Sequence, residues 1–198
     1  MKRDALTILR NDHANLAAML QSMREVVRRG PEGMASGGAE RFFDVLRAML
    51  FYIAEFPERQ HHPKESNLLF PRVARVAPHT LETIKRLEMD HLDSESSVRE
   101  IMHLLLAWEY LGESRRAAFE SEVDTYVQCY LAHMRLEERD ILPAAEQHLD
   151  PSERHALDLA FECMSDPLDQ SGPRDPAYDR LFSRIVLQAP APVGLAPA

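Results

Sequence analysis

Apolar residues recur every three or four positions along most of the chain, and no segment alternates apolar and polar residues with a period of two. A three-four spacing is typical of a helix with one buried face, whereas a strand buried on one face alternates. The pattern predicts four long helices, over about residues 4–29, 39–69, 78–111 and 114–143. Two shorter helices should follow, one from about 151 to 164 and one of about three turns from 175.

Glycine and proline mark where these helices end. Four of the seven glycines fall between residues 30 and 38, which predicts one loop there and leaves the rest of the chain free to be helical. Pro57 and Pro63 should interrupt or kink the second helix, because proline lacks the backbone N–H that an interior position donates. Ser114 is placed to cap the fourth helix, and residues 150–153, Asp-Pro-Ser-Glu, have the cap, proline and glutamate that open the fifth.

Four long helices joined by short loops favour an all-α fold, an antiparallel up-down four-helix bundle with one or two shorter C-terminal helices. We expect the bundle to span residues 1–148 and a helical extension, residues 149–188, to pack on it. Residues 189–198 are rich in alanine and proline, and this composition predicts a flexible tail.

Composition and charge exclude several classes of function. A formal net charge of -9 argues against nucleic acid as a partner, since binding a phosphate backbone requires lysine and arginine. The longest apolar run, Met49 to Ala54, is far shorter than the roughly 20 residues that span a bilayer, so we expect no membrane segment. Charged residues near the start of the chain argue against a signal peptide, and two cysteines without metal-ligand spacing suit a reducing compartment. We therefore expect a cytoplasmic protein.

Ionisable residues interrupt the apolar faces of the predicted helices. A core accommodates a neutral histidine through hydrogen bonds, but an unpaired buried carboxylate costs several kcal/mol. A positive group should therefore lie among these side chains. The residues concerned are His13, His91, Glu95, His133 and Glu137.

Three of the helices carry a histidine followed four residues later by a glutamate. One histidine on an apolar face is more often an ordinary core residue, and one glutamate there more often a misjudged helical phase. Each of the four helices has a histidine, however, and residues at i and i+4 share a helix face, where they can bind one ion or two neighbouring ions. The pattern predicts a metal site. The pairs are His61 and Glu65, His91 and Glu95, and His133 and Glu137.

The donor types select the metal. Imidazoles and carboxylates without thiolates exclude iron-sulfur centres and disfavour a cysteine zinc site, and so many histidines exclude calcium and magnesium. At least four histidines and two glutamates exceed what one ion takes while keeping an open position, so two ions bridged by Glu65 and Glu137 fit better. We expect two iron ions, Fe2+ or Fe3+, and manganese has similar ligand preferences.

These motifs resemble those of one known family. The signature of hemerythrin-like HHE cation-binding domains is similar to residues 61–71, His-His-Pro-Lys-Glu-Ser-Asn-Leu-Leu-Phe-Pro, with Phe-Pro before them at 56–57 and Met-Asp-His after them at 89–91. The remaining elements of that signature are similar to Asp-His at 12–13 and to His-Met-Arg-Leu-Glu at 133–137. The resemblance covers residues 5–143 and nothing beyond residue 150.

The resemblance implies a non-haem di-iron centre that binds or senses O2 or NO, or handles peroxide. By motif position, one iron would be held by His13 and His61, the other by His91 and His133, with Glu65 and Glu137 as bridges. Oxygen-carrying hemerythrins have a second histidine on the third helix where this chain has Glu95. A carboxylate there favours ferric iron, which shifts the expectation from oxygen carriage towards sensing, storage or redox chemistry.

Two ligands stay ambiguous at this point. His62 is adjacent to His61, and either could reach a metal once Pro63 perturbs the helix; the repeated i+4 spacing favours His61. Glu138 competes with Glu137, because the resemblance to oxygen-carrying hemerythrins implies a carboxylate five residues after the fourth-helix histidine; spacing within the chain favours Glu137.

Other interpretations are weaker. A ferritin-like site would use Glu-x-x-His motifs, which Glu58 and Glu88 could begin, but His13 stands where that site needs a glutamate. A regulatory module whose metal state alters the packing of residues 150–188, an iron-storage role and an iron-sulfur repair role are the functional alternatives. We expect Cys129 to be a buried core residue, and the remaining histidines to lie on the surface: His79, His103, His148 and His155.

Overall fold

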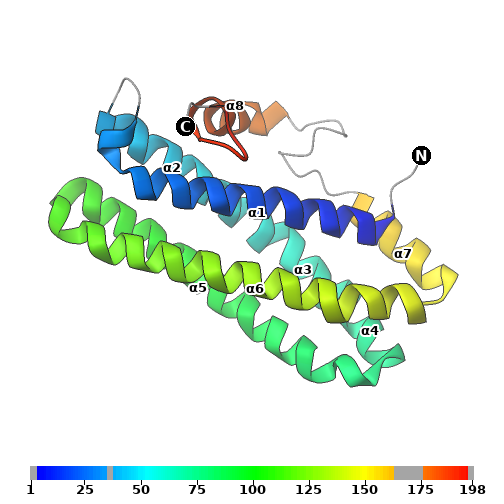
Figure 1. The fold of residues 1–198 in the computed structure, drawn as a ribbon. Helices are drawn as coiled ribbons and strands as arrows, with labels where there is room; N and C mark the ends of the chain where they lie inside the picture. Colours follow the sequence, from blue (N-terminus) through cyan, green and yellow to red (C-terminus); the bar gives the residue numbers. More distant parts are fainter. Residues whose placement is uncertain (1–3, 35–37, 163–175, 196–198) are drawn as a thin grey trace.

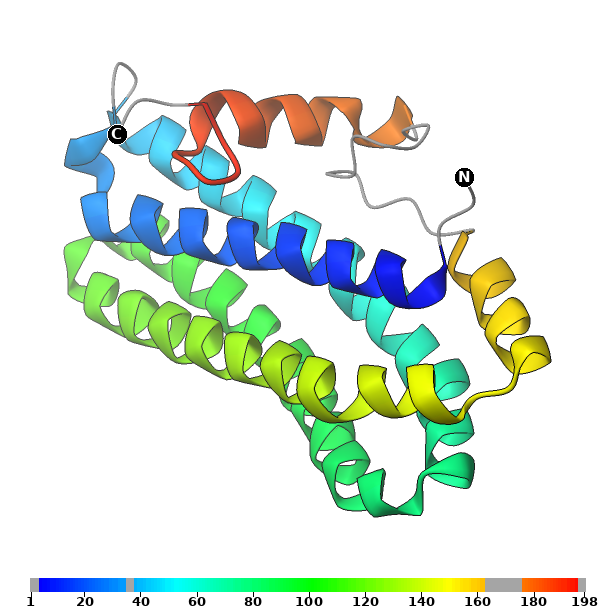
Figure 2. The same ribbon diagram turned by 45° about the vertical axis from the view of Figure 1, so that its right-hand side comes forward.

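The computed structural model describes residues 4–34, 38–162 and 176–195, and these residues form helices and connecting turns without a β-strand. The all-α prediction is confirmed. Figures 1 and 2 show the long helices packed side by side, with the direction of the chain reversing from one to the next. They are α1 (Ala5–Arg29), α2 (Gly38–Glu55), α5 (Leu81–Leu111) and α6 (Arg116–His148).

Between α2 and α5 the chain continues as a series of short helical segments. They are η2 (Pro57–His61), α3 (His62–Lys64), η3 (Glu65–Leu69) and α4 (Phe70–Val76), of which η2 and η3 are π-helical. Short 3-10 turns join the longer helices: η1 (Pro31–Gly33), η4 (Pro78–Thr80) and η5 (Glu113–Arg115).

Where a kink or an interruption was predicted at Pro57 and Pro63, the structure has π-helical turns. Pro57 has no N–H, and the next turn closes five residues back, where the N–H of His61 donates to the carbonyl of Phe56 at 3.2 Å. The helix therefore widens instead of ending and continues to Val76. Such π-bulges are frequent at functional sites because they rotate side chains out of the ordinary helical register. Here both His61 and His62 become buried.

Helix ends follow the sequence in most places. Asp4 caps α1 by accepting from the N–H of Thr7 at 2.9 Å. Gly30 and Gly112, at φ +66° and +86°, end α1 and α5 in a conformation that other residues adopt with strain. The prediction for Ser114 is wrong: it lies inside η5, and α6 begins at Arg116 without a side-chain cap.

The core is continuous along the long helices. On α6, every position of the predicted apolar face is buried, from Phe119 to Ile141. Near one end of the molecule, Trp108 is enclosed by the rings of Phe42, Phe43 and Phe119, with centroids 5.1–5.7 Å apart. Burial on this scale, at roughly 25 cal/mol per Å² of apolar surface, holds the helices together and lets them carry polar residues in the middle.

The C-terminal helices pack on the outside. Helix α7 (Pro151–Glu162) is capped by Asp150, which accepts from the N–H groups of Ser152 and Glu153 as predicted, and it lies against the start of α1. The turn η6 (Pro176–Tyr178) and α8 (Asp179–Gln188) lie along α2. The predicted end of the fifth helix at Met164 and the start of the sixth at Asp175 lie outside the described residues.

Residues 189–195 differ from the predicted flexible tail. Ala189 is fully buried, and the buried hydroxyl of Ser22 donates to the carbonyl of Pro190 and accepts from the N–H of Val193. The N–H of Leu195 donates to the carbonyl of Val186 at 2.7 Å. Composition alone predicted that this segment is flexible. Instead, residues 189–195 make hydrogen bonds to Ser22 on α1 and to Val186 on α8.

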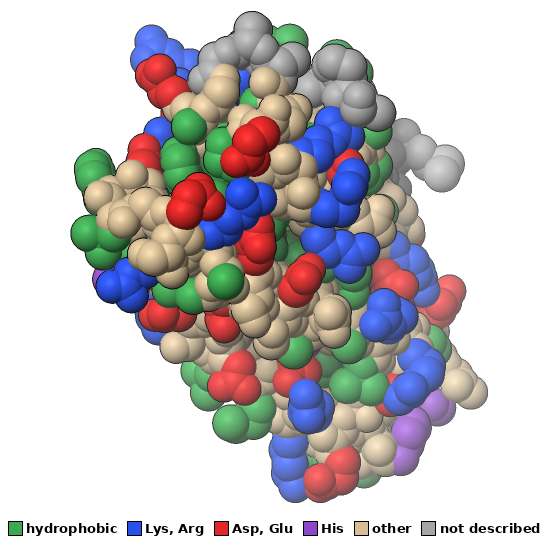
Figure 3. All heavy atoms as spheres, turned by 60° about the vertical axis from the view of Figure 1, so that its left-hand side comes forward, with side chains coloured by type: hydrophobic (Ala, Val, Ile, Leu, Met, Phe, Trp, Pro, Cys, Tyr) green, Lys and Arg blue, Asp and Glu red, His purple; other side chains and the backbone are tan. Residues whose placement is uncertain are grey.

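The surface carries mixed charge. On the face in Figure 3, Lys and Arg side chains are interspersed with Asp and Glu, and hydrophobic side chains form small separate patches. Among the described residues, none of the helices combines the length and apolar character that crossing a bilayer requires.

Candidate metal centre

Five of the nine histidines are buried, and all five lie in the middle of the helix assembly. Two fully buried glutamates, Glu65 and Glu137, lie among them. The four histidines predicted to be on the surface are exposed, which confirms that part of the sequence analysis. The buried histidines are His13, His61, His62, His91 and His133.

The buried side chains form two groups in which the possible ligand atoms all lie within 4.8 Å of one another. We call them the Glu137 group and the His133 group, and Glu65 belongs to both. The Glu137 group consists of His13, His61, Glu65 and Glu137, and the His133 group consists of His62, Glu65, His91 and His133.

Glu65 lies between the groups and presents one oxygen to each. Its Oε1 is 2.6 Å from Nε2 of His61, and its Oε2 is 3.4 Å from Nε2 of His91. On the other side, Nε2 of His13 is 3.3 Å from Oε2 of Glu137. Glu65 thus belongs to both groups, whereas Glu137 belongs to one of them.

Several of these atoms lack hydrogen bonds. Within the described residues, both oxygens of Glu65, both oxygens of Glu137 and Nε2 of His91 have no partner of good geometry, although histidine nitrogens lie close to Glu65. Leaving buried polar atoms unsatisfied costs roughly 1–3 kcal/mol each, and more for a charged group. A cation bound among them would remove this cost, so the donor set fits a metal.

Four of the five buried histidines have a hydrogen-bonding partner at Nδ1, on the side away from the groups, whereas Nδ1 of His133 has only the more distant carboxylate of Asp90. Such partners fix the ring orientation and the tautomer of a metal-binding histidine. Nε2 is left to point inward, except in His62, whose Nε2 is 2.5 Å from the hydroxyl of Tyr130. The Nδ1 distances are 2.9 Å from His13 to Glu138, 3.2 Å from His61 to Asp12, 3.2 Å from His62 to Glu58, 3.1 Å from His91 to Ser66 and 3.6 Å from His133 to Asp90.

The two glutamates differ in their affinity for protons. Burial raises the pKa of Glu137, and the nearby charge of Glu65 raises it further. Burial also favours the neutral form of Glu65, but the charge of His61 and the nearby nitrogens of His13 and His91 hold its pKa well below the usual range. Glu65 is therefore ionised, while Glu137 releases its proton less readily.

The buried histidines also differ in their pKa values. Burial alone lowers the pKa of His61, but the charge of Glu65 and the hydrogen bond to Asp12 outweigh burial and raise that pKa to about 10. The pKa of His13 is likewise raised, against burial, by Glu137, Glu138 and Glu65. For His62 burial dominates and lowers the pKa to about 4. Before metal binds, positive charge is thus favoured in the Glu137 group.

Glu95 lies outside both groups, and the prediction that it is buried one turn from His91 is wrong. Its side chain is 58% exposed and pairs with Arg99 on the surface. The reason is helical phase. The prediction placed Glu95 on the face of His91 by its i+4 spacing, whereas the buried positions of α5 after His91 are Val98 and Ile101, so the half-buried Ser94 takes the inward position.

The ambiguous residues now have places. His61 and His62 are both buried, one in each group, so they are not alternatives. The carboxylate of Glu138 contacts Nδ1 of His13, on the side away from the Glu137 group, and Glu137 itself belongs to that group. The ferritin-like candidates Glu58 and Glu88 lie outside both groups, beside His62 and Ser66 respectively. His62 was predicted only as an alternative to His61, and the neighbouring Pro63 was the sequence signal that either histidine could turn inward.

A cavity of about 490 Å³ lies between α5 and α6 and reaches His62 and His133. Its wall includes the buried rings of Tyr126 and Tyr130, and Cys129. Cys129 is exposed, so the prediction of a buried core cysteine is wrong. The cavity borders the His133 group through His62 and His133, and none of its lining residues belongs to the Glu137 group.

Comparison with known proteins agrees with this geometry. The family model of the hemerythrin HHE cation-binding domain matches residues 4–145, which include every member of both groups. No curated protein matches the chain. Domains of this family bind metal ions, typically iron, and the buried histidines and glutamates could hold such ions. The chain belongs to the hemerythrin HHE cation-binding domain family.

Proposed function

We propose that this protein is a non-haem di-iron protein that binds or senses O2 or NO, or handles peroxide, at an open iron position. The metal centre lies in an antiparallel up-down four-helix bundle. Its four members are α1, the consecutive segments from α2 to α4, α5 and α6. The observation that carries the proposal is Glu65, whose two oxygens face two separate sets of histidines.

Seven side chains would hold the metal: the four of the Glu137 group and the further three of the His133 group. Five imidazoles and two carboxylates without a thiolate favour iron, with manganese as the closest competitor. When bound, iron supplies reversible one-electron chemistry and a coordination position for a small ligand.

The surrounding residues position the ligands and control access. Asp12, Glu58 and Asp90 lie beside Nδ1 of His61, His62 and His133 respectively. Partners at that nitrogen fix the orientation of the imidazole ring. The apolar core around the groups excludes bulk water. Because the cavity between α5 and α6 ends at His62 and His133, a small ligand would arrive at the His133 group.

Anaerobic loading of the full chain with Fe2+, followed by metal analysis, tests the proposal. We expect two iron ions per chain, and one or none would contradict it. Loading with Mn2+ in parallel tests the choice of metal. An optical spectrum of the ferrous protein before and after air then separates the roles, since a reversible change indicates binding or sensing and an irreversible one indicates redox turnover.

A further inference from the structure

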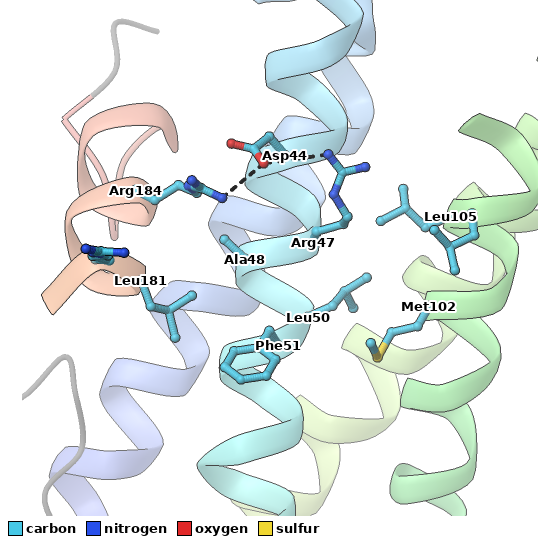
Figure 4. Close-up of a pocket in the computed structure, with 11 residues that line it drawn as sticks. Asp44, Arg47, Ala48, Leu50, Phe51, Met102, Leu105, Leu181 and Arg184 are labelled. Carbon is cyan, nitrogen blue, oxygen red and sulfur yellow. Dashed lines mark hydrogen bonds and ion pairs between the residues drawn. The ribbon is translucent and has the colours of Figure 1, made fainter. Parts of the chain in front are cut away.

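A second cavity, of about 610 Å³, lies on the other side of the molecule between α2, α5 and α8. Figure 4 shows Phe51 and Leu50 on α2, Met102 and Leu105 on α5, and Leu181 on α8 around it. Its volume is in the range of small-molecule sites. Because it shares no residue with the cavity beside the metal centre, it is a separate feature of the fold.

The cavity collects large apolar side chains that are exposed to solvent. Phe51 is 46% exposed, Met102 37% and Leu106 44%, and they come from two adjacent helices. Single exposed apolar residues are ordinary, but a group of them lining one hollow usually marks a binding surface. This hollow therefore has an apolar floor that an aliphatic chain would cover.

The rim of the cavity is cationic, although the protein as a whole is acidic. Arg47 is paired with Glu109 at 2.5 Å, and Arg184 is paired with Asp44 at 3.1 Å. Arg180 lines the same cavity and has no ion pair or hydrogen bond within the described residues. One positive charge at this rim is thus uncompensated in a chain of net charge -9.

Part of the charged rim lies outside the residues that match the family model. Arg180, Leu181 and Arg184 belong to α8, which lies beyond the residues that match the HHE family. The metal centre is complete without them. The position of α8 against α2 therefore adds a cavity that the family fold does not itself explain.

We propose that the cavity between α2, α5 and α8 binds an amphiphilic monoanion, a long-chain carboxylate, with its chain on Phe51, Met102 and Leu106 and its head group at Arg180. The single unpaired arginine matches one negative charge. A cavity of about 610 Å³ suits an aliphatic molecule better than an acidic helix of another protein, which would need a standard interface of about 800 Å² on this partner alone.

Calorimetric titration of the full chain with dodecanoate, below its micelle concentration, tests the proposal. We expect saturable binding at one site. Arg180→Gln should weaken dodecanoate binding about tenfold and leave binding of the uncharged dodecanol unchanged, because it removes one charge-assisted contact. Phe51→Ser should weaken the binding of both molecules. Both side chains are exposed, so neither change removes a core contact.

Arg24→Gln is the matched control, since Arg24 is an exposed arginine on α1 that does not line the cavity. It should bind dodecanoate as the unchanged protein does. Absence of dodecanoate binding would overturn the proposal, as would equal effects of Arg180→Gln and Arg24→Gln. Equally tight binding of dodecyltrimethylammonium, a cation with the same chain, would overturn the assignment of Arg180 to the head group.

Discussion

The Glu137 group and the His133 group share Glu65 but differ in charge and in surroundings. The Glu137 group has two carboxylates and two histidines, whereas the His133 group has one carboxylate and three histidines. The cavity between α5 and α6 is lined by His62 and His133 of the second group and by no member of the first. Because carboxylates are anionic and neutral imidazoles are not, we expect the Glu137 group to bind a cation more tightly. We expect a small ligand to bind at the cation of the His133 group, which borders the cavity.

Two adjacent residues make this difference possible. On an α-helix, neighbouring side chains point about 100° apart, so two consecutive histidines rarely reach one ion. His61 and His62 lie in different groups: His61 ends the π-helical turn η2, His62 begins α3, and Glu65 begins the next π-helical turn, η3. The distortion at Pro57 thus divides one His-His pair between the two groups.

Replacing Glu65 should have the largest effect. Glu65→Ala removes the one side chain common to both groups, so we expect iron content to fall from two ions per chain to well below one. Metal analysis after anaerobic loading and desalting measures this. Glu95→Gln is the control, because Glu95 is exposed and paired with Arg99, and it should keep both ions. If Glu65→Ala retained two ions, Glu65 would not be the bridge.

Replacing one unshared ligand from each group should remove one ion and distinguish the two sites. Glu137→Gln removes an anionic donor from the tighter group, and His133→Gln removes a donor from the group beside the cavity. We expect one ion per chain in each variant. The His133→Gln protein should also lose the response of its spectrum to NO, whereas Glu137→Gln should keep part of it. The reverse pattern would place the open position in the Glu137 group.

Metal-free protein should lose stability as pH rises from about 6.5 towards 10. His61 has a pKa of about 10 in the folded chain and about 6.5 when unfolded, so the folded state keeps a proton in this range that the unfolded chain has released. The free energy of unfolding must then fall with rising pH. The raised pKa of His13 acts in the same direction.

Urea denaturation of metal-free and iron-loaded protein at several pH values between 6.5 and 9 measures this slope. Bound metal takes the place of the protons, so the loaded protein should show little of it. His155→Gln, at an exposed histidine, should leave the slope unchanged. A stability of the metal-free protein that stayed constant or rose over this range would contradict the electrostatic difference between the groups.

The residues that orient the histidines should have smaller effects. Asp12→Asn weakens the partner of His61, and Asp90→Asn that of His133, and loss of such a partner commonly lowers metal affinity about tenfold or more. We expect each change to weaken one site and spare the other, as measured by competition with a metal chelator. Asp124→Asn, at an exposed position of α6, should change neither affinity.

Most of the predicted histidines and glutamates are buried, because residues three or four apart in the sequence share one face of a regular helix. The face of α6 from Phe119 through His133 to Ile141 follows its apolar pattern throughout, since a long regular helix has one phase. The same reasoning failed on α5 at Glu95, because three-four and four-three spacings both fit its apolar residues and only packing chooses between them.

The remaining differences have physical causes that no local pattern records. The inward turn of both His61 and His62 requires a π-helical register, which depends on how the chain continues through Pro57. The packing of residues 189–195 depends on Ser22, more than 160 residues away. Long-range hydrogen bonds of this kind are invisible to periodicity and composition.

Tyr130 should give the smallest effect and the sharpest test of the second site. Its hydroxyl lies 2.5 Å from Nε2 of His62, the nitrogen that would bind a metal in the His133 group, so the phenol competes with the ion for that nitrogen. Tyr130→Phe removes this competitor, and we expect the affinity for the second ion to rise a few-fold while the first is unchanged.

Tyr126→Phe is the matched control, because the hydroxyl of Tyr126 lies 3.4 Å from Glu58 and from Ser94 and contacts no histidine of either group. It should leave both affinities unchanged. A chelator titration of the two variants measures the effect. If Tyr130→Phe instead weakened the second ion, the hydroxyl would be holding His62 in its binding orientation, and the His133 group would depend on Tyr130 as His61 depends on Asp12.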